Sequence, residues 1–380
     1  MKKALPERQR MARIKMLSGD RRPVHPQAWN VSQHRARRPR RRDTPRGTRM
    51  AKRSLSRMVV AGLVVGAALG AALAPAAAAD KVTFLTSWFA QAEHGGFYQA
   101  KATGLYDKAG LDVTIKMGGP QVNGSQLLLA GDADFMMGYD IQVLKGREQN
   151  LPLVTVASSF QFDLQGIMTH DDIVDLAALK GKPILIAGSS RTTFWPWLRI
   201  KYGYTDEQIR PYTFNLQPFF ADKTVAQQAY PSSEPYQAEQ QNEKVKFFLL
   251  ADSGYPPYGS TIVTTEKMIA DKPDLVARFV QASLEGWRDY MKNPAPANAL
   301  IKAANAKMTD GQIAFALERM REIKAIDRGD AATLGLGIIT ADRYRQIYEF
   351  LVAGGLLDPK VDWHKAFDDR FVKNLKIGVN

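Results

Sequence analysis

The 380-residue sequence contains no cysteine. This absence excludes disulfide bonds, thiolate metal sites, cysteine nucleophiles and anchoring through a lipid-modified cysteine. A protein without such cross-links has to depend on its hydrophobic core for stability. Residues 80–380 are numerous enough to build two domains around such cores.

Acidic residues are scarce at the beginning of the chain, where the first 79 residues hold 19 Lys and Arg against 3 Asp and Glu. The remaining residues hold 33 Lys and Arg against 35 Asp and Glu, so the net charge of +14 belongs to the N-terminal part. A strongly basic protein often binds nucleic acid or a membrane surface. Because the rest of the chain is close to neutral, we expect no nucleic-acid partner.

Residues 1–49 are the most basic part of the chain and include the run RRPRRRDTPR. We expect this extension to be disordered, because it is highly charged and has few residues that could form a core. Met50 then provides an alternative start of translation.

Residues 50–79 have the pattern of a leader. Three cationic residues precede the apolar run MVVAGLVVGAALGAALAPAAAA, which ends in alanines just before Asp80. This order is typical of a signal peptide, and we expect cleavage after Ala77-Ala78-Ala79 and a periplasmic protein. The run is also about long enough to span a membrane, so an uncleaved anchor is the alternative. Pro75 and the alanines favour cleavage.

Strand-like and helix-like runs alternate after this leader. The strand-like runs are residues 81–88, 111–117, 134–139 and 152–160, and the helix-like runs between them are residues 96–110, 123–133 and 141–150. This alternation predicts a parallel sheet with helices on both faces. A second unit of the same kind begins near residue 176, and the chain returns to the first unit at residues 260–280.

The last part of the chain has a helical pattern. Thr309-Asp310-Gly311-Gln312 is a capping box before an apolar run, and Thr340 begins another helix that ends at Gly354-Gly355. We therefore predict an α/β protein with two doubly wound lobes and a helical C-terminal region. Two such lobes leave a ligand cleft at the carboxyl ends of their strands.

The predicted parts are residues 80–170 and 260–300 for lobe 1, residues 171–259 for lobe 2, and residues 301–380 for helices packed on the lobes.

Four segments carry a resemblance to a known family. They are SWFAQAEHGGFYQAKATGLYDKAGLDVTI, LLLAGDADF, GKPILIAGSS and QAYPSSEPYQ. The chain resembles the SsuA/THI5-like (NMT1) family of periplasmic substrate-binding proteins, most closely its thiamine-pyrimidine-precursor branch, over roughly residues 80 to 300. The resemblance implies a type II periplasmic-binding-protein fold that captures a small heteroaromatic amine of the formylaminopyrimidine or hydroxymethylpyrimidine type. It also implies delivery to an ABC permease that is coupled to a cytoplasmic ATPase. We expect a monomer without cofactor or metal.

Three other functions compete with this one. The first is a nitrate-, sulfonate- or taurine-binding protein of the same family. The second is an enzyme, because the family also contains a thiamine pyrimidine synthase that uses pyridoxal phosphate, iron and its own histidine. The similarity places Gly138 at the synthase's lysine, Gln142 at its donor histidine and residues 254–258 at its cysteine motif, so we expect no such activity. The third is a ligand-sensing module, which ranks last because no transmitter domain is encoded.

Two residues of the first motif are candidates for the cleft. Trp88 ends a strand, and its ring suits stacking on a flat ligand, although a place in the core is the alternative. His94 precedes a helix and lacks both metal-ligand companions and a nucleophile partner. We expect it to be a neutral imidazole that hydrogen-bonds the ligand, with a structural role as an equal alternative.

Two strand ends supply further candidates. Tyr139 and Asp140 end the third strand-like run, and helix capping is the alternative role of Asp140. The segment AGSSRTT is a strand-to-helix turn whose free N–H groups suit an anion or a carbonyl. Its candidates are Ser189, Ser190, Arg191 and Thr192. The alternatives here are helix capping by Ser190, Thr192 or Thr193, and simple exposure for Arg191.

Glu234 is the strongest candidate. It precedes a proline between Tyr230 and Tyr236, a place poorly suited to stabilising a helix. The resemblance implies that this glutamate faces the ligand, where it suits an exocyclic amine. A buried carboxylate directed at an anion is costly, which disfavours nitrate and sulfonate. Aromatic residues that complete the cleft wall or belong to the lobe cores are Tyr230, Trp195, Phe220, Tyr255 and Tyr258.

Overall fold

The computed structural model describes residues 78–378. The predicted extension, residues 1–49, and nearly all of the predicted signal peptide, residues 50–79, lie outside the described residues. Within residues 78–378, no helix is both long and apolar enough to cross a membrane.

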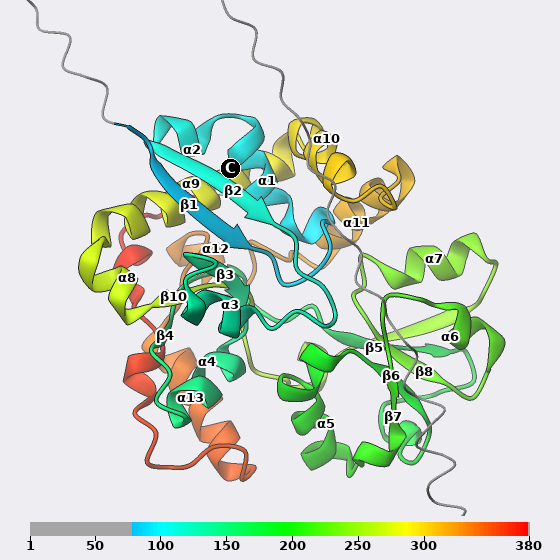
Figure 1. The fold of residues 1–380 in the computed structure, drawn as a ribbon. Coiled ribbons are helices and arrows are strands. Elements are labelled where there is room, and N and C mark those ends of the chain that lie inside the picture. Colours follow the sequence, from blue (N-terminus) through cyan, green and yellow to red (C-terminus); the bar gives the residue numbers. More distant parts are fainter. Residues whose placement is uncertain (1–77, 379–380) are drawn as a thin grey trace, which may run out of the picture. The chain divides into compact units, whose positions relative to one another are not determined.

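The described chain folds into two lobes, each built on a five-stranded sheet (Figure 1). The first sheet has the order β2-β1-β3-β10-β4 and the second has the order β7-β6-β8-β5-β9. The strands of the first sheet are β1 (Asp80–Leu85), β2 (Leu111–Lys116), β3 (Phe135–Gly138), β4 (Leu153–Phe160) and β10 (Gly259–Thr265). The strands of the second sheet are β5 (Gly166–His170), β6 (Ile184–Ile186), β7 (Ile209–Pro211), β8 (Ala226–Ala229) and β9 (Val245–Leu249).

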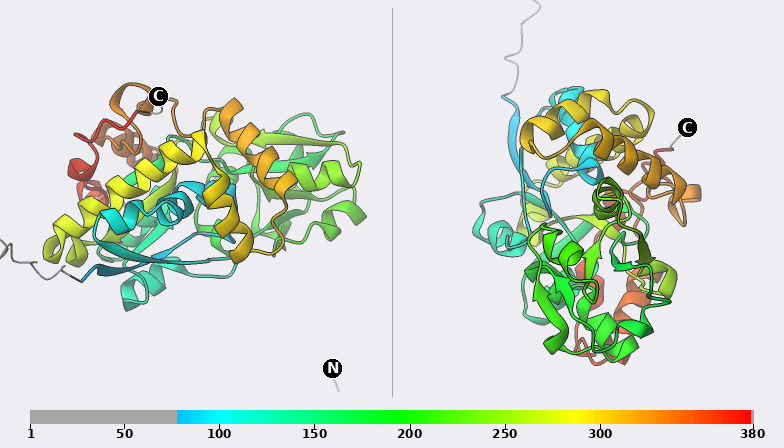
Figure 2. Two further views of the ribbon diagram at one scale, coloured as in Figure 1. Left: turned by 90° about the horizontal axis from the view of Figure 1, so that it is seen from above. Right: turned by 90° about the vertical axis from the view of Figure 1, so that its right-hand side faces the viewer.

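Helices cover both faces of the first sheet, as Figure 2 shows for α1 and α9 on one face and α3 on the other. The helical segments of this lobe are η2 (Ala92–His94), α1 (Gly95–Ala102), α2 (Leu105–Lys108), α3 (Gly124–Ala130), α4 (Asp140–Glu148), α8 (Glu266–Asp271) and α9 (Pro273–Lys292). Those of the second lobe include η4 (Gly188–Thr192), α5 (Trp195–Tyr202), α6 (Gln217–Ala221) and α7 (Glu234–Gln240). The doubly wound α/β prediction is confirmed.

The sheets are mixed, whereas the alternating pattern predicts parallel ones. In the first sheet β1 runs parallel to β2 and β3, but β10 runs antiparallel to β3 and β4. In the second sheet β5 runs antiparallel to β8 and β9. In each sheet, the antiparallel strand is the first strand that the chain forms after it crosses from the other lobe. This strand is β10 in the first sheet and β5 in the second. Such a strand follows a strand of the other lobe without a helical crossover, so it arrives from the opposite direction.

Two short connectors join the lobes, residues 161–165 and residues 250–258. Asp163 in the first connector donates its backbone N–H to the carbonyl oxygen of Pro257 in the second, at 3.2 Å. The chain therefore leaves the first sheet before β5, although the sequence predicts lobe 1 to continue to residue 170. Nothing in the local pattern of residues 161–165 marks the crossing.

The C-terminal part is helical and comprises α10 (Ala295–Ala304), α11 (Asp310–Glu322), α12 (Ala331–Leu334) and α13 (Ala341–Ala353). Thr309 and Thr340 are the N-caps of α11 and α13, as predicted. The capping box is only half formed, because the Gln312 side chain donates instead to the carbonyl oxygens of Ser232 and Ser233, at 3.2 and 3.1 Å. Helix α11 thus touches the second lobe as well as η2 of the first.

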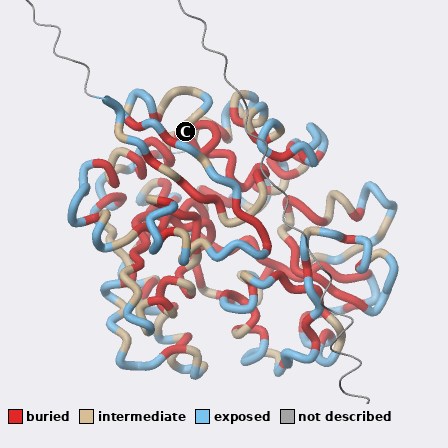
Figure 3. The backbone as a smooth tube through the Cα atoms, viewed as in Figure 1, coloured by how far each residue is buried: buried red, intermediate tan, exposed pale blue. Residues whose placement is uncertain are grey.

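The core of the first lobe holds α1 tightly on α9. A Cβ atom on Gly96 would lie 2.2 Å from the Trp287 ring, and one on Gly286 would lie 2.2 Å from the carbonyl oxygen of Gly96. Glycine is needed at both positions because nothing larger fits between the helices. Figure 3 shows buried residues along the strands of both lobes and where the lobes meet. This packing fixes η2, which directly precedes α1.

Candidate functional site

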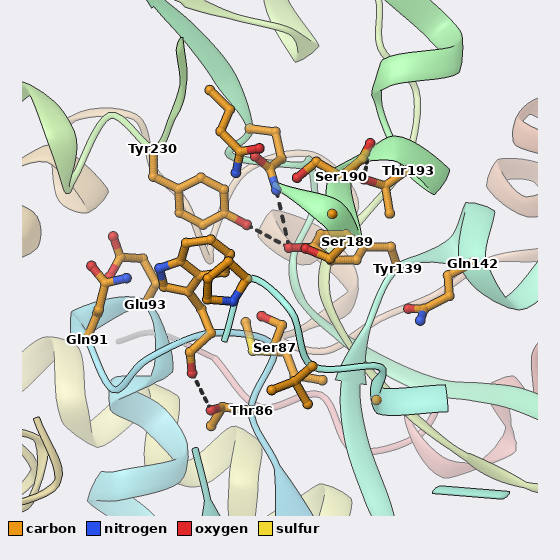
Figure 4. Close-up of a pocket in the computed structure, with 18 of the residues that line it drawn as sticks. Thr86, Ser87, Gln91, Glu93, Tyr139, Gln142, Ser189, Ser190, Thr193 and Tyr230 are labelled. Atoms are coloured by element: carbon orange, nitrogen blue, oxygen red, sulfur yellow. Dashed lines mark hydrogen bonds between the residues drawn. The ribbon is translucent and has the colours of Figure 1, made fainter. Parts of the chain in front are cut away.

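A cavity of about 420 Å³ lies between the lobes. Segments that follow the carboxyl ends of strands line it, which is where the sequence predicts the cleft. The first lobe contributes the loop after β1 with η2, the loop before α3 and the end of β3. The second lobe contributes η4 and the turn between β8 and α7 (Figure 4).

The wall of the cavity carries two acidic side chains. Glu93 of the first lobe and Glu234 of the second both line it. No Lys or Arg is found among the described residues that line it. The other lining groups are aromatic rings, side-chain amides, hydroxyls, His94 and apolar side chains such as Val122, Met136 and Met137, which suit a ligand with a flat ring and hydrogen-bonding groups.

Glu234 is held in place by two hydrogen bonds. It is 4% exposed and begins α7. Its Oε1 accepts the Tyr212 hydroxyl at 2.7 Å and its Oε2 accepts the Tyr230 backbone N–H at 2.9 Å. Burial raises the pKa of Glu234 to about 7, although both hydrogen bonds favour the charged form. The expectation that this position does not suit a helix is wrong, since the carboxylate lies in the first turn of α7, where negative charge is favourable.

Trp88 lines the cavity and also reaches across it. Its ring lies nearly parallel to that of Tyr212, with centroids 6.3 Å apart and an interplanar angle of 20°. It meets the Phe214 ring edge-on at 6.1 Å. Both partners belong to the second lobe, whereas the Trp88 backbone is fixed in the first lobe by a 2.7 Å bond from the Thr86 hydroxyl to the Trp88 carbonyl. Trp88 therefore joins the lobes beside the cavity.

The residues of η2 form a polar corner of the site. His94 lines the cavity, and its Nδ1 accepts the Gln91 backbone N–H at 3.3 Å. Burial lowers the pKa of His94 to about 3, so the ring is neutral and carries its proton on Nε2 as a donor. Gln91 and Glu93 reach the other lobe, where they accept hydrogen bonds from the hydroxyls of Ser233, at 2.9 Å, and of Ser232.

Two tyrosines make another contact between the lobes. The hydroxyls of Tyr139, after β3, and Tyr230, after β8, lie 3.2 Å apart (Figure 4). Gln165 of the first connector donates its Nε2 to the Tyr139 hydroxyl at 3.4 Å. Tyr139 and Tyr230, both predicted for the cleft, therefore line the cavity as a pair.

The segment after β6 also lines the cavity, through Ser189, Ser190 and Thr192. The predicted alternative, helix capping by Ser190, Thr192 or Thr193, is not observed. Helix α5 begins at Trp195 with Phe194 as its N-cap, and no side chain caps it. Instead the Thr192 hydroxyl donates to the carbonyl oxygen of Ser189 at 3.2 Å.

Asp140 and Tyr258 lie outside the cavity wall. Asp140 is the first residue of α4, but it neither caps that helix nor lines the cavity. Its carboxylate accepts the Tyr258 backbone N–H at 2.8 Å and the Tyr344 hydroxyl at 2.6 Å. The Tyr258 hydroxyl accepts the backbone N–H of Thr340 at 3.2 Å. Both residues thus tie α13 to the first lobe.

Arg191 and Trp195 also lie away from the cavity wall. The Arg191 side chain is exposed on η4. Trp195 is buried within the second lobe, where its Nε1–H donates to Asp206 at 2.8 Å and its ring packs on Tyr204.

Sequence reasoning missed Glu93 and Gln91. They stand one and three positions before His94, in the same motif, so proximity to that histidine was the available signal. Nothing in the local sequence around Ser232 and Ser233 predicts that their hydroxyls donate to Glu93 and Gln91 of the other lobe. Among the described residues, no group of three or more His, Asp and Glu side chains is arranged to hold a metal ion.

Comparisons with known proteins concern the family and the fold. The model of the NMT1/THI5 like family matches residues 91–297. The riboflavin-binding protein RibY of Chloroflexus aurantiacus is 26% identical over 302 residues, which cover 77% of this chain and 86% of that protein. The formylaminopyrimidine-binding protein of Halalkalibacterium halodurans is 24% identical over 237 residues, which cover 59% of this chain and 71% of that protein.

Among solved structures, the alkanesulfonate-binding protein SsuA from Xanthomonas axonopodis pv. citri bound to MOPS matches with a TM-score of 0.57 at 16% identity. The match covers 77% of this chain and 100% of that one. At this identity the likeness concerns the fold alone, which is that of the periplasmic binding proteins.

Proposed function

The chain belongs to the NMT1/THI5-like family, and from this premise we propose that it is the solute-binding protein of an ABC importer whose ligand is a small heteroaromatic amine. The observation that carries the proposal is the cavity between the lobes, lined by Glu93, Glu234 and aromatic rings but by no cationic side chain of the described residues.

Glu234 and Trp88 are the contacts that we assign to the ligand. An amine on a heteroaromatic ring donates to the Glu234 carboxylate, and a hydrogen bond to a charged group contributes roughly 1.5–3 kcal/mol. The ring stacks on Trp88, which adds about 0.5–1.5 kcal/mol beyond the area buried. The neutral His94 supplies a donor for a ring nitrogen. A thiamine pyrimidine precursor of the formylaminopyrimidine or hydroxymethylpyrimidine type has these features.

A nitrate, sulfonate or taurine ligand fits this wall less well. An anion between two acidic side chains would need both to be protonated or would meet a large electrostatic penalty. Arg191 is the one Lys or Arg among the predicted site residues. Its side chain is exposed and does not line the cavity. The hydroxyls and side-chain amides of the wall are neutral donors and offer little to balance a full negative charge.

A pyrimidine synthase activity is also disfavoured by the residues present. A Cβ atom on Gly138 would lie 2.8 Å from Val263 Cγ2, so this backbone leaves no room for a lysine side chain there. Gln142 stands at the donor-histidine position and donates its Nε2 to Ser125 at 2.8 Å. Incubation with pyridoxal phosphate and iron should give neither Schiff-base absorbance nor a pyrimidine product.

We further propose that the protein acts in the periplasm as a monomer and delivers its ligand to a permease coupled to a cytoplasmic ATPase. The leader pattern of residues 50–79 supports export, and strand β1 begins at Asp80, directly after the expected cleavage point. N-terminal sequencing of the exported protein should begin near Asp80. A mature protein that retains residues 58–79 would indicate an anchored form instead.

Calorimetry tests the ligand class directly. The purified protein is titrated with aminopyrimidines, riboflavin, taurine, an alkyl sulfonate and nitrate. We expect micromolar or tighter binding of an aminopyrimidine, weakened by Glu234→Gln. Tight binding of nitrate or a sulfonate that is unaffected by Glu234→Gln would refute the proposed ligand and the role of this residue.

A further inference from the structure

Helix α11 of the C-terminal region lies between the first lobe and helix α7 of the second (Figure 1). It is anchored on the first lobe at both ends. Asn305, which precedes α11, donates its Nδ2 to the carbonyl oxygen of Ala90 at 2.9 Å. Arg321, in the last turn of α11, donates to the carbonyl oxygen of Met291 at 3.0 Å. Side chains of α11 that reach the second lobe therefore connect the two lobes.

Gln312, in the first turn of α11, binds the turn that carries Glu234. Its Nε2 donates to the carbonyl oxygens of Ser232 and Ser233, at 3.2 and 3.1 Å. These oxygens belong to the two consecutive peptide groups that directly precede Glu234. Among residues 78–378, no other side chain donates to either oxygen. Gln312 is itself buried, so both hydrogen bonds are shielded from water.

The turn has no local cap that could hold it instead. Ser233 is the N-cap residue of α7, and a serine there normally fixes the start of the helix through its own side chain. Its hydroxyl makes no such bond and donates to Gln91 of the first lobe at 2.9 Å. The Ser232 hydroxyl likewise donates to Glu93. The start of α7, and Glu234 with it, is therefore held in part from outside the second lobe.

The contact between α7 and α11 continues beyond the turn. The rings of Tyr236 and Phe315 lie 5.5 Å apart, at an interplanar angle of 51°. A Cβ atom on Gly311 would lie 2.3 Å from the Tyr236 hydroxyl oxygen, so the helices approach closely where α11 begins. This packing keeps the backbone that carries Gln312 beside the turn.

We propose that Gln312 is a positioning residue for ligand binding, which holds the turn before α7 so that the Glu234 carboxylate meets the ligand in one fixed orientation. This inference rests on the proposed role of Glu234 and adds a residue that does not line the cavity. Because Gln312 belongs to a helix anchored on the first lobe, the two lobes together define where this carboxylate of the second lobe lies.

A double-mutant cycle tests whether Gln312 acts through Glu234. Gln312→Ala should weaken binding of 4-amino-5-hydroxymethyl-2-methylpyrimidine by about threefold to tenfold in calorimetry, because the hydrogen bonds that hold the turn are lost. In a Glu234→Gln background the same substitution should change the affinity by less than about twofold, because the carboxylate that it positions is absent. Equal losses in both backgrounds, or no loss in either, would overturn the inference while the proposed function stands.

Gln208→Ala is the matched control. The Gln208 Nε2 also donates to two backbone carbonyl oxygens, those of Leu179 and Lys182, both at 2.8 Å. Gln208 is 4% exposed and Gln312 is 5% exposed, but Gln208 lies within the second lobe and away from the cavity wall. Gln208→Ala should lower the melting temperature and leave the affinity unchanged. A loss of affinity as large as that of Gln312→Ala would show that general destabilisation causes it. Circular dichroism establishes that each variant is folded.

Amide hydrogen exchange gives a second measurement that needs no ligand. The Tyr230 backbone N–H donates to Glu234 Oε2 at 2.9 Å, so its exchange reports how firmly the carboxylate is held. Gln312→Ala should speed this exchange by about threefold to tenfold, whereas Gln208→Ala should not. An unchanged rate in Gln312→Ala would overturn the positioning role. If the wild-type protein binds no aminopyrimidine, the proposed function fails, and this exchange still decides whether Gln312 positions Glu234.

Discussion

The hydroxyl of Tyr212 lies 2.7 Å from Glu234 Oε1 and donates a hydrogen bond to it, while the ring of the same tyrosine lies nearly parallel to Trp88. The two residues that we assign to the ligand are thus connected through one side chain of the second lobe. A change at Tyr212 is expected to affect the carboxylate without removing it.

Tyr212→Phe should shift the pH dependence of binding. The Tyr212 hydrogen bond favours the charged form of Glu234, so its loss raises the pKa of Glu234 above about 7. A carboxylate accepts an N–H better than a protonated carboxyl group does. Affinity for an aminopyrimidine should therefore contain a component that rises as pH increases through about 7, and Tyr212→Phe should move this rise to higher pH. Calorimetry between pH 5.5 and 8.5 measures it, with Glu234→Gln, which lacks the component, as the reference. An unchanged midpoint would contradict the assignment.

Glu234→Gln should reduce ligand affinity by about tenfold to a hundredfold, because a charge-assisted hydrogen bond is replaced by a weaker one or by none. Asp140→Asn is the matched control, since Asp140 is equally buried but does not line the cavity. It should leave affinity nearly unchanged and lower the melting temperature, because Asp140 holds Tyr344 and the Tyr258 backbone. Equal losses of affinity in both variants would show that the effect is structural.

The candidates that do line the cavity are mostly residues that follow a strand. Trp88 and Tyr139 each end an apolar strand-like run and Ser189 closely follows one, and the carboxyl ends of neighbouring strands meet at one edge of a sheet. The position of such residues is set by local sequence and by one general property of α/β folds. This part of the site could therefore be predicted from the sequence.

The remaining features depend on partners that are distant in the sequence. Asp140 binds Tyr344, 204 residues further on, and Glu93 binds Ser232, 139 residues further on. The local pattern around Asp140 is equally compatible with a helix cap, a core residue and a ligand contact. The direction of β5 could not be predicted from the local sequence either, because an apolar run does not indicate which sheet its strand joins.

Asp163→Asn should flatten the dependence of stability on pH. Burial raises the pKa of Asp163 from 3.8 to about 8, with a further contribution from the charge of Asp140. The folded protein thus binds this proton more tightly than the unfolded chain does. The resulting stability is fully present below pH 3.8 and is lost as pH rises through about 8.

Melting temperatures of the wild type and Asp163→Asn should therefore diverge between pH 5 and 9, with the variant losing less stability at the alkaline end. The amide keeps an acceptor for the Gln165 backbone N–H, which donates to Asp163 at 3.0 Å. Asp171→Asn, at an exposed position, serves as the control and should follow the wild type. Parallel curves for all three proteins would show that Asp163 does not titrate in this range.

Trp88→Ala should weaken both ligand binding and closure of the lobes. The substitution removes the predicted stacking surface together with the contacts to Tyr212 and Phe214. We expect a loss of affinity of about threefold to tenfold from the stacking interaction alone. Solution scattering should show a smaller decrease in the radius of gyration when ligand is added. Trp363→Phe, in the C-terminal region, should behave like the wild type in both measurements.

The position of Trp88 also means that tryptophan fluorescence should report whether the cleft is occupied. Of the five tryptophans among residues 78–378, Trp88 is the one that lines the cavity. Trp195, Trp197 and Trp287 are buried in the cores of the lobes. A ring stacked on Trp88 quenches its emission and leaves that of the buried tryptophans to report the integrity of the fold. Titrations followed by intrinsic fluorescence can therefore screen unlabelled compounds against the native chain, and the same signal followed in a stopped-flow instrument gives the rates at which ligands enter and leave.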